Sequence, residues 1–177
     1  EIFDFMVETA LDGMKKTFED YNVELDKFIR ESDFVFGGAV NDVVEKLKAT
    51  PYWFEREGVS AVDLEKFNIK KELVLLRSDG TTLYTTRDLA YHLWKLQHGD
   101  CINVIANEQT LQQQQLRAAL KIMGIKDVDE RVRHLAYELV SVPGMRMSSR
   151  TGEFISSDDL LAEGTQRARK EINSRQL

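Results

Sequence analysis

Three polar side chains stand where two predicted strands give way to helices. Tyr84 and Asp88 follow the apolar run 73–77, and Gln109 follows the apolar run 101–106. In a doubly wound sheet, ligands bind at the carboxyl ends of the strands, where the helices begin. A carboxylate there can accept two parallel hydrogen bonds from a guanidinium, while a phenol and an amide bond or pack beside it. If the two junctions are adjacent, the three residues face one crevice that suits a ligand with an amine or a guanidinium.

Local helix capping offers a different interpretation of the same residues. Thr85 followed three residues later by Asp88 fits a capping box, which stabilises a helix start by ~1 kcal/mol. Tyr84 is then an ordinary strand residue, Asn107 is the N-cap of the next helix, and Gln109 lies on the surface. The residues alone leave both interpretations open.

A polar loop at residues 143–152 has the composition of an anion-binding element. It contains two arginines, three hydroxyl groups and two flanking glycines. Arginine stays charged at any relevant pH and matches the geometry of phosphate. The residues expected to act here are Arg146, Ser148, Ser149 and Arg150. Such a loop can close over a triphosphate and stabilise the charge that develops as pyrophosphate leaves, although the same residue types are common in a solvated loop.

Other motifs that carry chemistry are few. His134 lies in an extended segment and could contact a purine, although a lone His in a strand is more often structural. No set of Cys and His residues has the spacing of a zinc site, so no metal site is predicted. Neither a P-loop nor a dinucleotide fingerprint is present.

The elements that must position these residues alternate between apolar strands and helices. Strands are predicted at 73–77, 101–106 and 132–142, helices at 85–98, 108–123 and 156–175, a turn at 78–81 and an extended segment at 82–84. This alternation predicts an α/β fold with a mostly parallel sheet. Earlier in the chain, helices at 3–20 and 41–48 and a strand at 52–56 accompany an irregular segment at 20–36.

The predicted organisation therefore has three parts. A small α+β connective segment occupies residues 1–71, a doubly wound half-domain occupies 72–144, and the polar loop with its following helix occupies 145–177. At 177 residues the chain could form one large domain or two small ones.

Composition narrows the class of protein further. Apolar residues make up 42% of the chain and the net charge is −6, which is not typical of a stand-alone nucleic-acid binder. The single cysteine, Cys101, lies in an apolar run and fits a reduced thiol in a cytosolic protein. No apolar run approaches the ~20 residues that span a bilayer, and no signal peptide is visible. The sequence thus predicts a cytoplasmic protein without a membrane partner, and the missing initiator Met is expected of an excised piece.

Three motifs resemble one known family. Residues 77–91, RSDGTTLYTTRDLAY, resemble the arginyl-tRNA synthetase stretch RSDGTxLYxTRDxAY. Residues 104–109, VIANEQ, are similar to that family's next strand and turn, and residues 146–152, RMSSRTG, resemble its form of the KMSKS loop, KMSxRxG. The order and spacing of all three agree with the family, and the closest likeness is to its archaeal branch.

The resemblance implies a class I aminoacyl-tRNA synthetase with a Rossmann-type catalytic domain. Such an enzyme joins L-arginine to ATP, which carries Mg²⁺, as arginyl-adenylate, and then transfers arginine to tRNA(Arg). The family's arginine-recognising Tyr, Asp and Gln fall on Tyr84, Asp88 and Gln109. The loop residues Arg146, Ser148, Ser149 and Arg150 are implied to be catalytic, and Met147, with His134, is expected to contact ATP.

Two departures from the family pattern matter. No His-containing HIGH tetrapeptide and no helical anticodon-binding domain is present, so the chain is expected to be a fragment that is inactive alone. In the KMSKS-like loop, Arg146 stands in place of the first Lys and Ser149 in place of the second. The alternatives are a non-catalytic nucleotide-binding half-domain and a different adenylyl-transferring Rossmann enzyme.

The loop composition yields a kinetic prediction. In the full-length enzyme we expect Arg146→Ala and Arg150→Ala to slow adenylate formation by about 10²-fold, because charges aimed at departing pyrophosphate act chiefly in the transition state. The dissociation constant of ATP should stay nearly unchanged. Pre-steady-state measurement separates the two quantities, and weaker ATP binding at an unchanged rate would show that the loop only binds the nucleotide.

Overall fold

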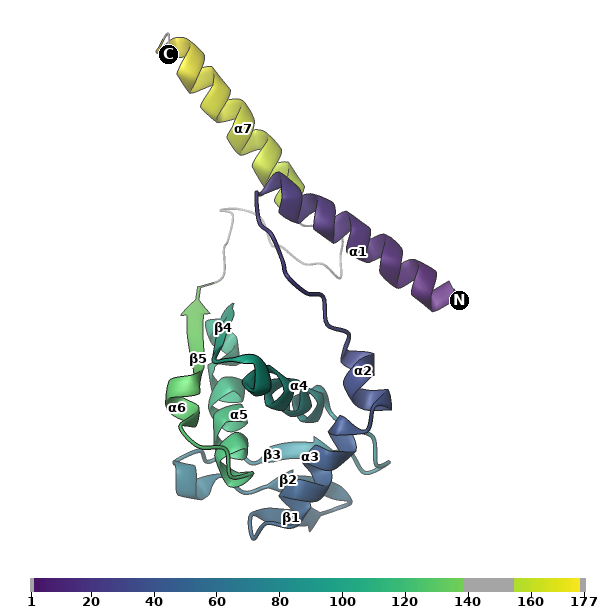
Figure 1. Ribbon diagram of the computed structural model, residues 1–177. Coiled ribbons are helices and arrows are strands. Elements are labelled where there is room, and N and C mark those ends of the chain that lie inside the picture. Colours follow the sequence, from purple (N-terminus) through teal and green to yellow (C-terminus); the bar gives the residue numbers. More distant parts are fainter. Residues whose placement is uncertain (1, 139–154, 176–177) are drawn as a thin grey trace. The chain divides into compact units, whose positions relative to one another are not determined.

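The computed structural model describes residues 2–138 and 155–175, which fall into two compact units (Figure 1). One unit comprises the described residues 2–28 and 155–175, and the other comprises residues 29–138. The larger unit contains both predicted strand-to-helix junctions.

The smaller unit consists of two long helices, α1 (Ile2–Asp20) and α7 (Ser157–Ser174). Both helices were predicted from the sequence and both are confirmed. The start of α7 is fixed by a capping box, in which the Ser156 hydroxyl accepts from the Asp159 N–H at 3.0 Å and the Asp159 carboxylate accepts from the Ser156 N–H. Tyr21, just beyond α1, donates its hydroxyl to the backbone oxygen of Ser157 at 2.7 Å, which ties the two helices together.

The larger unit contains twelve described elements. They are α2 (Glu31–Phe36), α3 (Ala39–Lys48), β1 (Trp53–Arg56), β2 (Val59–Val62), η1 (Glu65–Phe67), β3 (Leu73–Leu76), α4 (Tyr84–His98), β4 (Cys101–Ala106), η2 (Asn107–Gln109), α5 (Thr110–Ile122), α6 (Val128–Arg131) and β5 (Val132–Tyr137). The helix α2 corrects the expectation that residues 20–36 are irregular throughout. Its Phe34 is 8% exposed and packs on Tyr91 of α4, so a tertiary contact stabilises a helix that is too short to form alone.

Two separate sheets replace the single parallel sheet expected from the sequence. The strands β1, β2 and β3 form an antiparallel sheet, and β4 pairs with β5 in parallel. The α/β class is confirmed, but the placement of residues 73–77 in the parallel sheet is wrong. An apolar run alone does not distinguish a buried parallel strand from a buried antiparallel one. The division of the chain at residues 71 and 144 stays a prediction, although β2 and β3 pair across the first boundary.

One apolar core connects both sheets with the helices of the larger unit. Its fully buried side chains include Leu47 of α3, Leu75 of β3, Leu89 of α4, Leu120 of α5 and Val132 of β5. The core therefore holds α4 and α5, the two helices that follow the predicted junctions, in fixed positions. The lone Cys101, which lies in an apolar run of the sequence, is also buried.

The core yields a stability prediction within one helix. Leu120 is 0% exposed, so Leu120→Ala should lower the free energy of unfolding by about 2–5 kcal/mol through lost burial and the cavity that remains. The exposed Gln114 of the same helix is the matched control, and Gln114→Ala should change the free energy by no more than about 0.5 kcal/mol. Urea unfolding of the chain measures both, and equal effects would show that α5 is not packed as described.

Candidate functional site

The first junction differs from its sequence prediction at the helix start. The helix α4 begins at Tyr84, which was expected in an extended segment, and its N-cap Leu83 makes no side-chain capping bond. The predicted capping box of Thr85 and Asp88 is therefore wrong. The reason is that the hydroxyl of Thr85 bonds the backbone oxygen of Val74 at 3.1 Å instead of capping its own helix.

A second threonine anchors the same helix start to the strand β3. Thr86 is 0% exposed and donates its hydroxyl to the backbone oxygen of Leu75 at 2.7 Å, and the Leu83 N–H donates to that oxygen at 3.0 Å. Between β3 and α4, the predicted turn at 78–81 is confirmed, with Gly80 in the left-handed region at φ +79°. These bonds place Tyr84 and Asp88 on the exposed side of an anchored helix end.

The second junction is a short helical turn rather than a direct helix start. Asn107 opens η2, and its backbone oxygen accepts from the Thr110 hydroxyl at 2.6 Å, so the predicted N-cap role of Asn107 is wrong. Gln109 is the last residue of η2 and the N-cap of α5, and its side chain makes no capping bond. Its amide is therefore not used for local helix capping.

A cavity of about 410 Å³ brings the two junctions together within the larger unit. Tyr84 and Asp88 line it from α4, and Gln109 lines it from the start of α5. The remaining lining is partly apolar, from Phe34, Tyr91, Ile105 and Leu116, and partly polar, from Gln112 and Gln113. An apolar cavity with a few convergent polar groups is the usual form of a small-molecule site. The three residues predicted to share a crevice thus line one cavity.

The charges at this cavity are already partly paired. Arg87 forms an ion pair with Glu31, and both residues line the cavity. The Asp88 side chain is 35% exposed, and one of its oxygens lies 3.1 Å from Nδ1 of His92. In the part of the chain that the structure describes, no Lys or Arg forms an ion pair with Asp88. The carboxylate consequently remains available to a cationic ligand.

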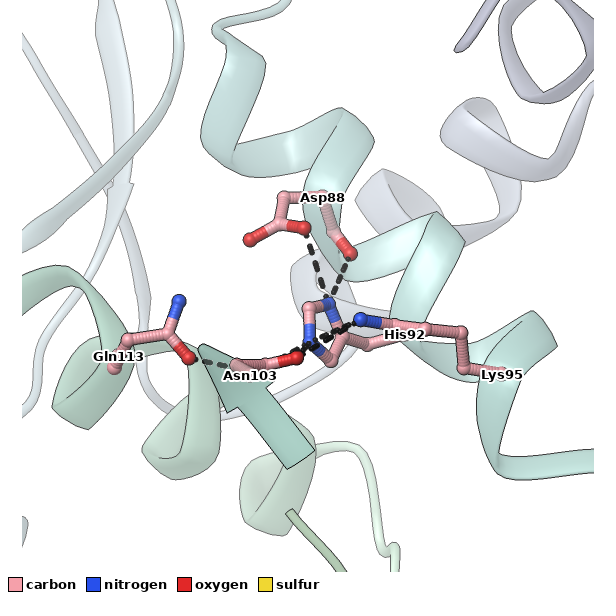
Figure 2. A network of polar contacts seen from close by, with 5 residues as sticks. All are labelled: Asp88, His92, Lys95, Asn103 and Gln113. Atoms are coloured by element: carbon pink, nitrogen blue, oxygen red, sulfur yellow. Dashed lines mark hydrogen bonds and ion pairs between the residues drawn. The ribbon is translucent and has the colours of Figure 1, made fainter. Parts of the chain in front are cut away.

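A buried polar network lies behind Asp88 (Figure 2). His92 contacts Asp88 through Nδ1, and its Nε2 lies 2.9 Å from both Nζ of Lys95 and Nδ2 of Asn103. Asn103 also donates to the side-chain oxygen of Gln113 at 2.7 Å, so the network runs from α4 through β4 to α5. Sequence reasoning missed these residues, although a polar Asn103 within the apolar run 101–106 was a usable signal.

Burial shifts the pKa of Lys95, which belongs to this network, and of Cys101, which lies beside it. It lowers the pKa of the Lys95 ammonium below its usual value, while the nearby Cys101 and Asp88 act in the opposite direction. Burial likewise raises the pKa of the Cys101 thiol, against the effect of Lys95. The buried Cys101 thiol is therefore less reactive than an exposed thiol.

Among the other predicted site residues, His134 does not line the cavity. His134 lies on β5, where its Nε2 donates to the backbone oxygen of Ile105 at 2.9 Å, and its contact with ATP stays a prediction. The loop residues Arg146, Met147, Ser148, Ser149 and Arg150 lie outside the described residues. Within residues 2–138 and 155–175, no cluster of three or more His, Cys, Asp or Glu side chains could hold a metal ion. No helix in those ranges is long and apolar enough to cross a membrane.

The α/β fold with a cavity at two helix starts fits the catalytic domain of a class I aminoacyl-tRNA synthetase. Over residues 1–177 the sequence matches the family model described as tRNA synthetases class I (R), catalytic domain. The chain belongs to this family, the class I synthetases specific for arginine.

Individual relatives agree with this family. An arginine–tRNA ligase from Methanocella arvoryzae is 47% identical over 171 residues, which cover 96% of this chain and 30% of that protein. One from Methanocaldococcus jannaschii is 44% identical, over 98% of this chain and 30% of the relative. The arginyl-tRNA synthetase structure from Thermus thermophilus matches 97% of this chain and 35% of its own, at 27% identity and a TM-score of 0.81. The chain thus spans about 30% of the length of these curated relatives, and both of them are archaeal, as the resemblance predicted.

The lowered pKa of Lys95 yields a prediction on stability and pH. Between the folded pKa of Lys95 and its unfolded value of 10.5, the unfolded chain binds more protons than the folded one. The free energy of unfolding contributed by Lys95 should therefore rise as the pH rises through that window. Urea unfolding at several pH values gives the free energy of unfolding of wild type and of Lys95→Met. The free energy of wild type relative to Lys95→Met should increase as the pH rises through this window. The exposed Lys48→Met controls for the loss of a lysine, and a flat difference for Lys95→Met would contradict the assignment.

Proposed function

We propose that this chain supplies the arginine-binding part of an arginine–tRNA ligase. The observation that carries the proposal is the single cavity lined by Tyr84, Asp88 and Gln109, three residues that come from two helix starts. Tyr84 and Asp88 bind the guanidinium, and Gln109 supports an amino group of the substrate. Family membership is consistent with this assignment.

The reaction needs positioning and electrostatic stabilisation more than a protein nucleophile. The carboxylate of arginine attacks the α-phosphate of ATP, the bond to the β-phosphate oxygen breaks, and pyrophosphate leaves with its electron pair. The arginyl-adenylate then gives its acyl group to a hydroxyl of the terminal adenosine of tRNA(Arg), and AMP leaves. ATP enters with Mg²⁺ as part of the substrate. Arg146, Ser148, Ser149 and Arg150 stabilise the departing pyrophosphate, and Met147 and His134 contact ATP.

The division of labour along the chain follows from this assignment. Residues 72–144 carry the second half of the Rossmann-type catalytic domain, residues 1–71 connect to it, and residues 145–177 carry the KMSKS-like loop and the following helix. The whole enzyme acts in the cytoplasm on arginine, ATP and tRNA(Arg).

Selectivity for arginine rests on the charge and geometry of the cavity. A guanidinium that leaves water needs a partner, because an unpaired buried ion costs several kcal/mol. The Asp88 carboxylate offers that partner with bidentate geometry, and it is engaged by His92 on one oxygen only. Lysine carries a compact ammonium that cannot make the same pair of bonds, and a neutral analogue would leave Asp88 unpaired.

Replacement of Asp88 by Asn tests the proposed function. In the full-length enzyme, Asp88→Asn should lower kcat/KM for arginine by about 10²-fold, because the amide keeps the size of the side chain but loses its charge. The KM for ATP should change little. Because Asp88 is not a helix cap, the melting temperature should stay near wild type.

The control is the same substitution at an exposed turn. Asp79 lies outside the cavity, where it accepts from Thr81, so Asp79→Asn should leave arginine kinetics unchanged. Normal arginine kinetics in a folded Asp88→Asn enzyme would show that arginine binds elsewhere.

A further inference from the structure

The Asp88 carboxylate is held in place by a buried histidine on its own helix. His92 is 2% exposed, and its Nδ1 lies 2.8 Å from the backbone oxygen of Asp88 and 3.1 Å from the carboxylate oxygen Oδ1. Both oxygens only accept hydrogen bonds, so Nδ1 carries the proton and donates. Figure 2 shows the second carboxylate oxygen turned away from the imidazole ring. One lone pair of Oδ1 is thereby engaged, while the other lone pair of Oδ1 and both lone pairs of Oδ2 are left for a ligand.

The opposite side of the same ring is fixed by two donors. Nε2 of His92 lies 2.9 Å from Nζ of Lys95 and 2.9 Å from Nδ2 of Asn103, while Oδ1 of Asn103 is farther away, at 3.2 Å. An ammonium can only donate, so Nε2 presents its lone pair and the ring is neutral. Lys95 also donates to the side-chain oxygen of Asn103 at 3.0 Å, which leaves the Asn103 amide nitrogen to bond His92 and Gln113. The tautomer and orientation of His92 thus follow from its neighbours.

The network also links two walls of the cavity. Asp88 lines the cavity from α4, and Gln113 lines it from α5, where it is 4% exposed. The oxygen of Gln113 is bound to Asn103, and Asn103 is bound to His92. A shift of the ring would therefore disturb the carboxylate and the opposite wall together.

We propose that His92 is a positioning residue for arginine recognition. This role rests on the proposed function. The Nδ1–H of His92 holds the Asp88 carboxylate in the orientation that receives both N–H groups of a guanidinium. Asn103 and Lys95 hold the ring for that task, without contact to the substrate. Bidentate pairing requires a fixed carboxylate plane, and loss of such positioning costs rate or affinity even when the carboxylate itself remains.

Two substitutions at His92 separate positioning from simple filling of the core. The amide nitrogen of Asn reaches the place of Nδ1, so His92→Asn keeps a donor for Asp88. The amide of Gln reaches the place of Nε2, so His92→Gln keeps the bonds to Asn103 and Lys95 but loses the donor for Asp88. Both variants leave a polar amide in the same buried place.

In the full-length enzyme, we expect His92→Gln to raise the KM for arginine about 10-fold, with the KM for ATP and the melting temperature near wild type. His92→Asn should restore most of that loss. In an Asp88→Asn background, His92→Gln should have no further effect on arginine kinetics, because residues that act as one unit are not additive. Steady-state pyrophosphate exchange, with arginine and ATP varied in turn, gives all these values.

Three results would overturn the positioning role. They are an unchanged arginine KM in His92→Gln, equal effects of the Asn and Gln substitutions, and an effect of His92→Gln that persists in the Asp88→Asn background. A normal arginine KM in Asp88→Asn alone would instead remove the proposed arginine site, and His92 with it. If His92→Gln does not fold, Asn103→Ser is the second variant, because it removes one donor to Nε2 of His92. Asn103→Ser should raise the arginine KM only in an enzyme with an intact Asp88. An unchanged arginine KM in that enzyme would contradict the proposal.

Discussion

The proposed site depends on one carboxylate, that of Asp88, which is partly buried and forms no ion pair with a Lys or Arg among the described residues. Water can solvate Asp88 only in part, so its negative charge requires donors that do not neutralise it. A neutral imidazole meets that requirement, because it donates one hydrogen bond and carries no charge. If Arg87, the neighbouring residue in α4, formed an ion pair with Asp88, the carboxylate would already be neutralised by the protein. Instead Arg87 pairs with Glu31.

Rigid placement of that carboxylate requires the start of α4 to be fixed, and helix capping does not fix it. The hydroxyls of Thr85 and Thr86 bond backbone oxygens of β3, and the apolar core holds Leu89 one turn later. Both hydrogen bonds are tertiary, so the start of α4 is held by the strand β3 and not by a cap within α4. The antiparallel direction of β3 is immaterial to this function, since what counts is a buried strand whose carbonyls reach the helix.

Spacing in the sequence was sufficient to find the cavity, but not the network behind it. Tyr84 and Asp88 lie in the first turns of the helix that follows one apolar run, and Gln109 precedes the helix that follows the next, so chain connectivity brings them to helix starts. His92 and Asn103 are eleven residues apart on different elements, so their contact depends on how α4 packs on β4. The predicted capping box of Thr85 and Asp88 is wrong for a related reason. A threonine hydroxyl can bond a local or a tertiary acceptor, and the sequence does not show the tertiary acceptors. Likewise, the apolar pattern of β3 is compatible with either sheet direction.

The net charge of the described cavity lining agrees with the ligand proposed above. Its charged side chains are Glu31, Arg87 and Asp88, so two carboxylates and one guanidinium leave one negative charge. For the amino-acid substrate proposed above, the zwitterionic head group adds no net charge, so a cationic side chain would complement this lining. Of the two carboxylates, Glu31 is already engaged by Arg87, which directs the incoming cation to Asp88. With His92 fixing the direction in which Asp88 accepts, as proposed, the lining would distinguish a planar guanidinium from a compact ammonium by geometry as well as by charge.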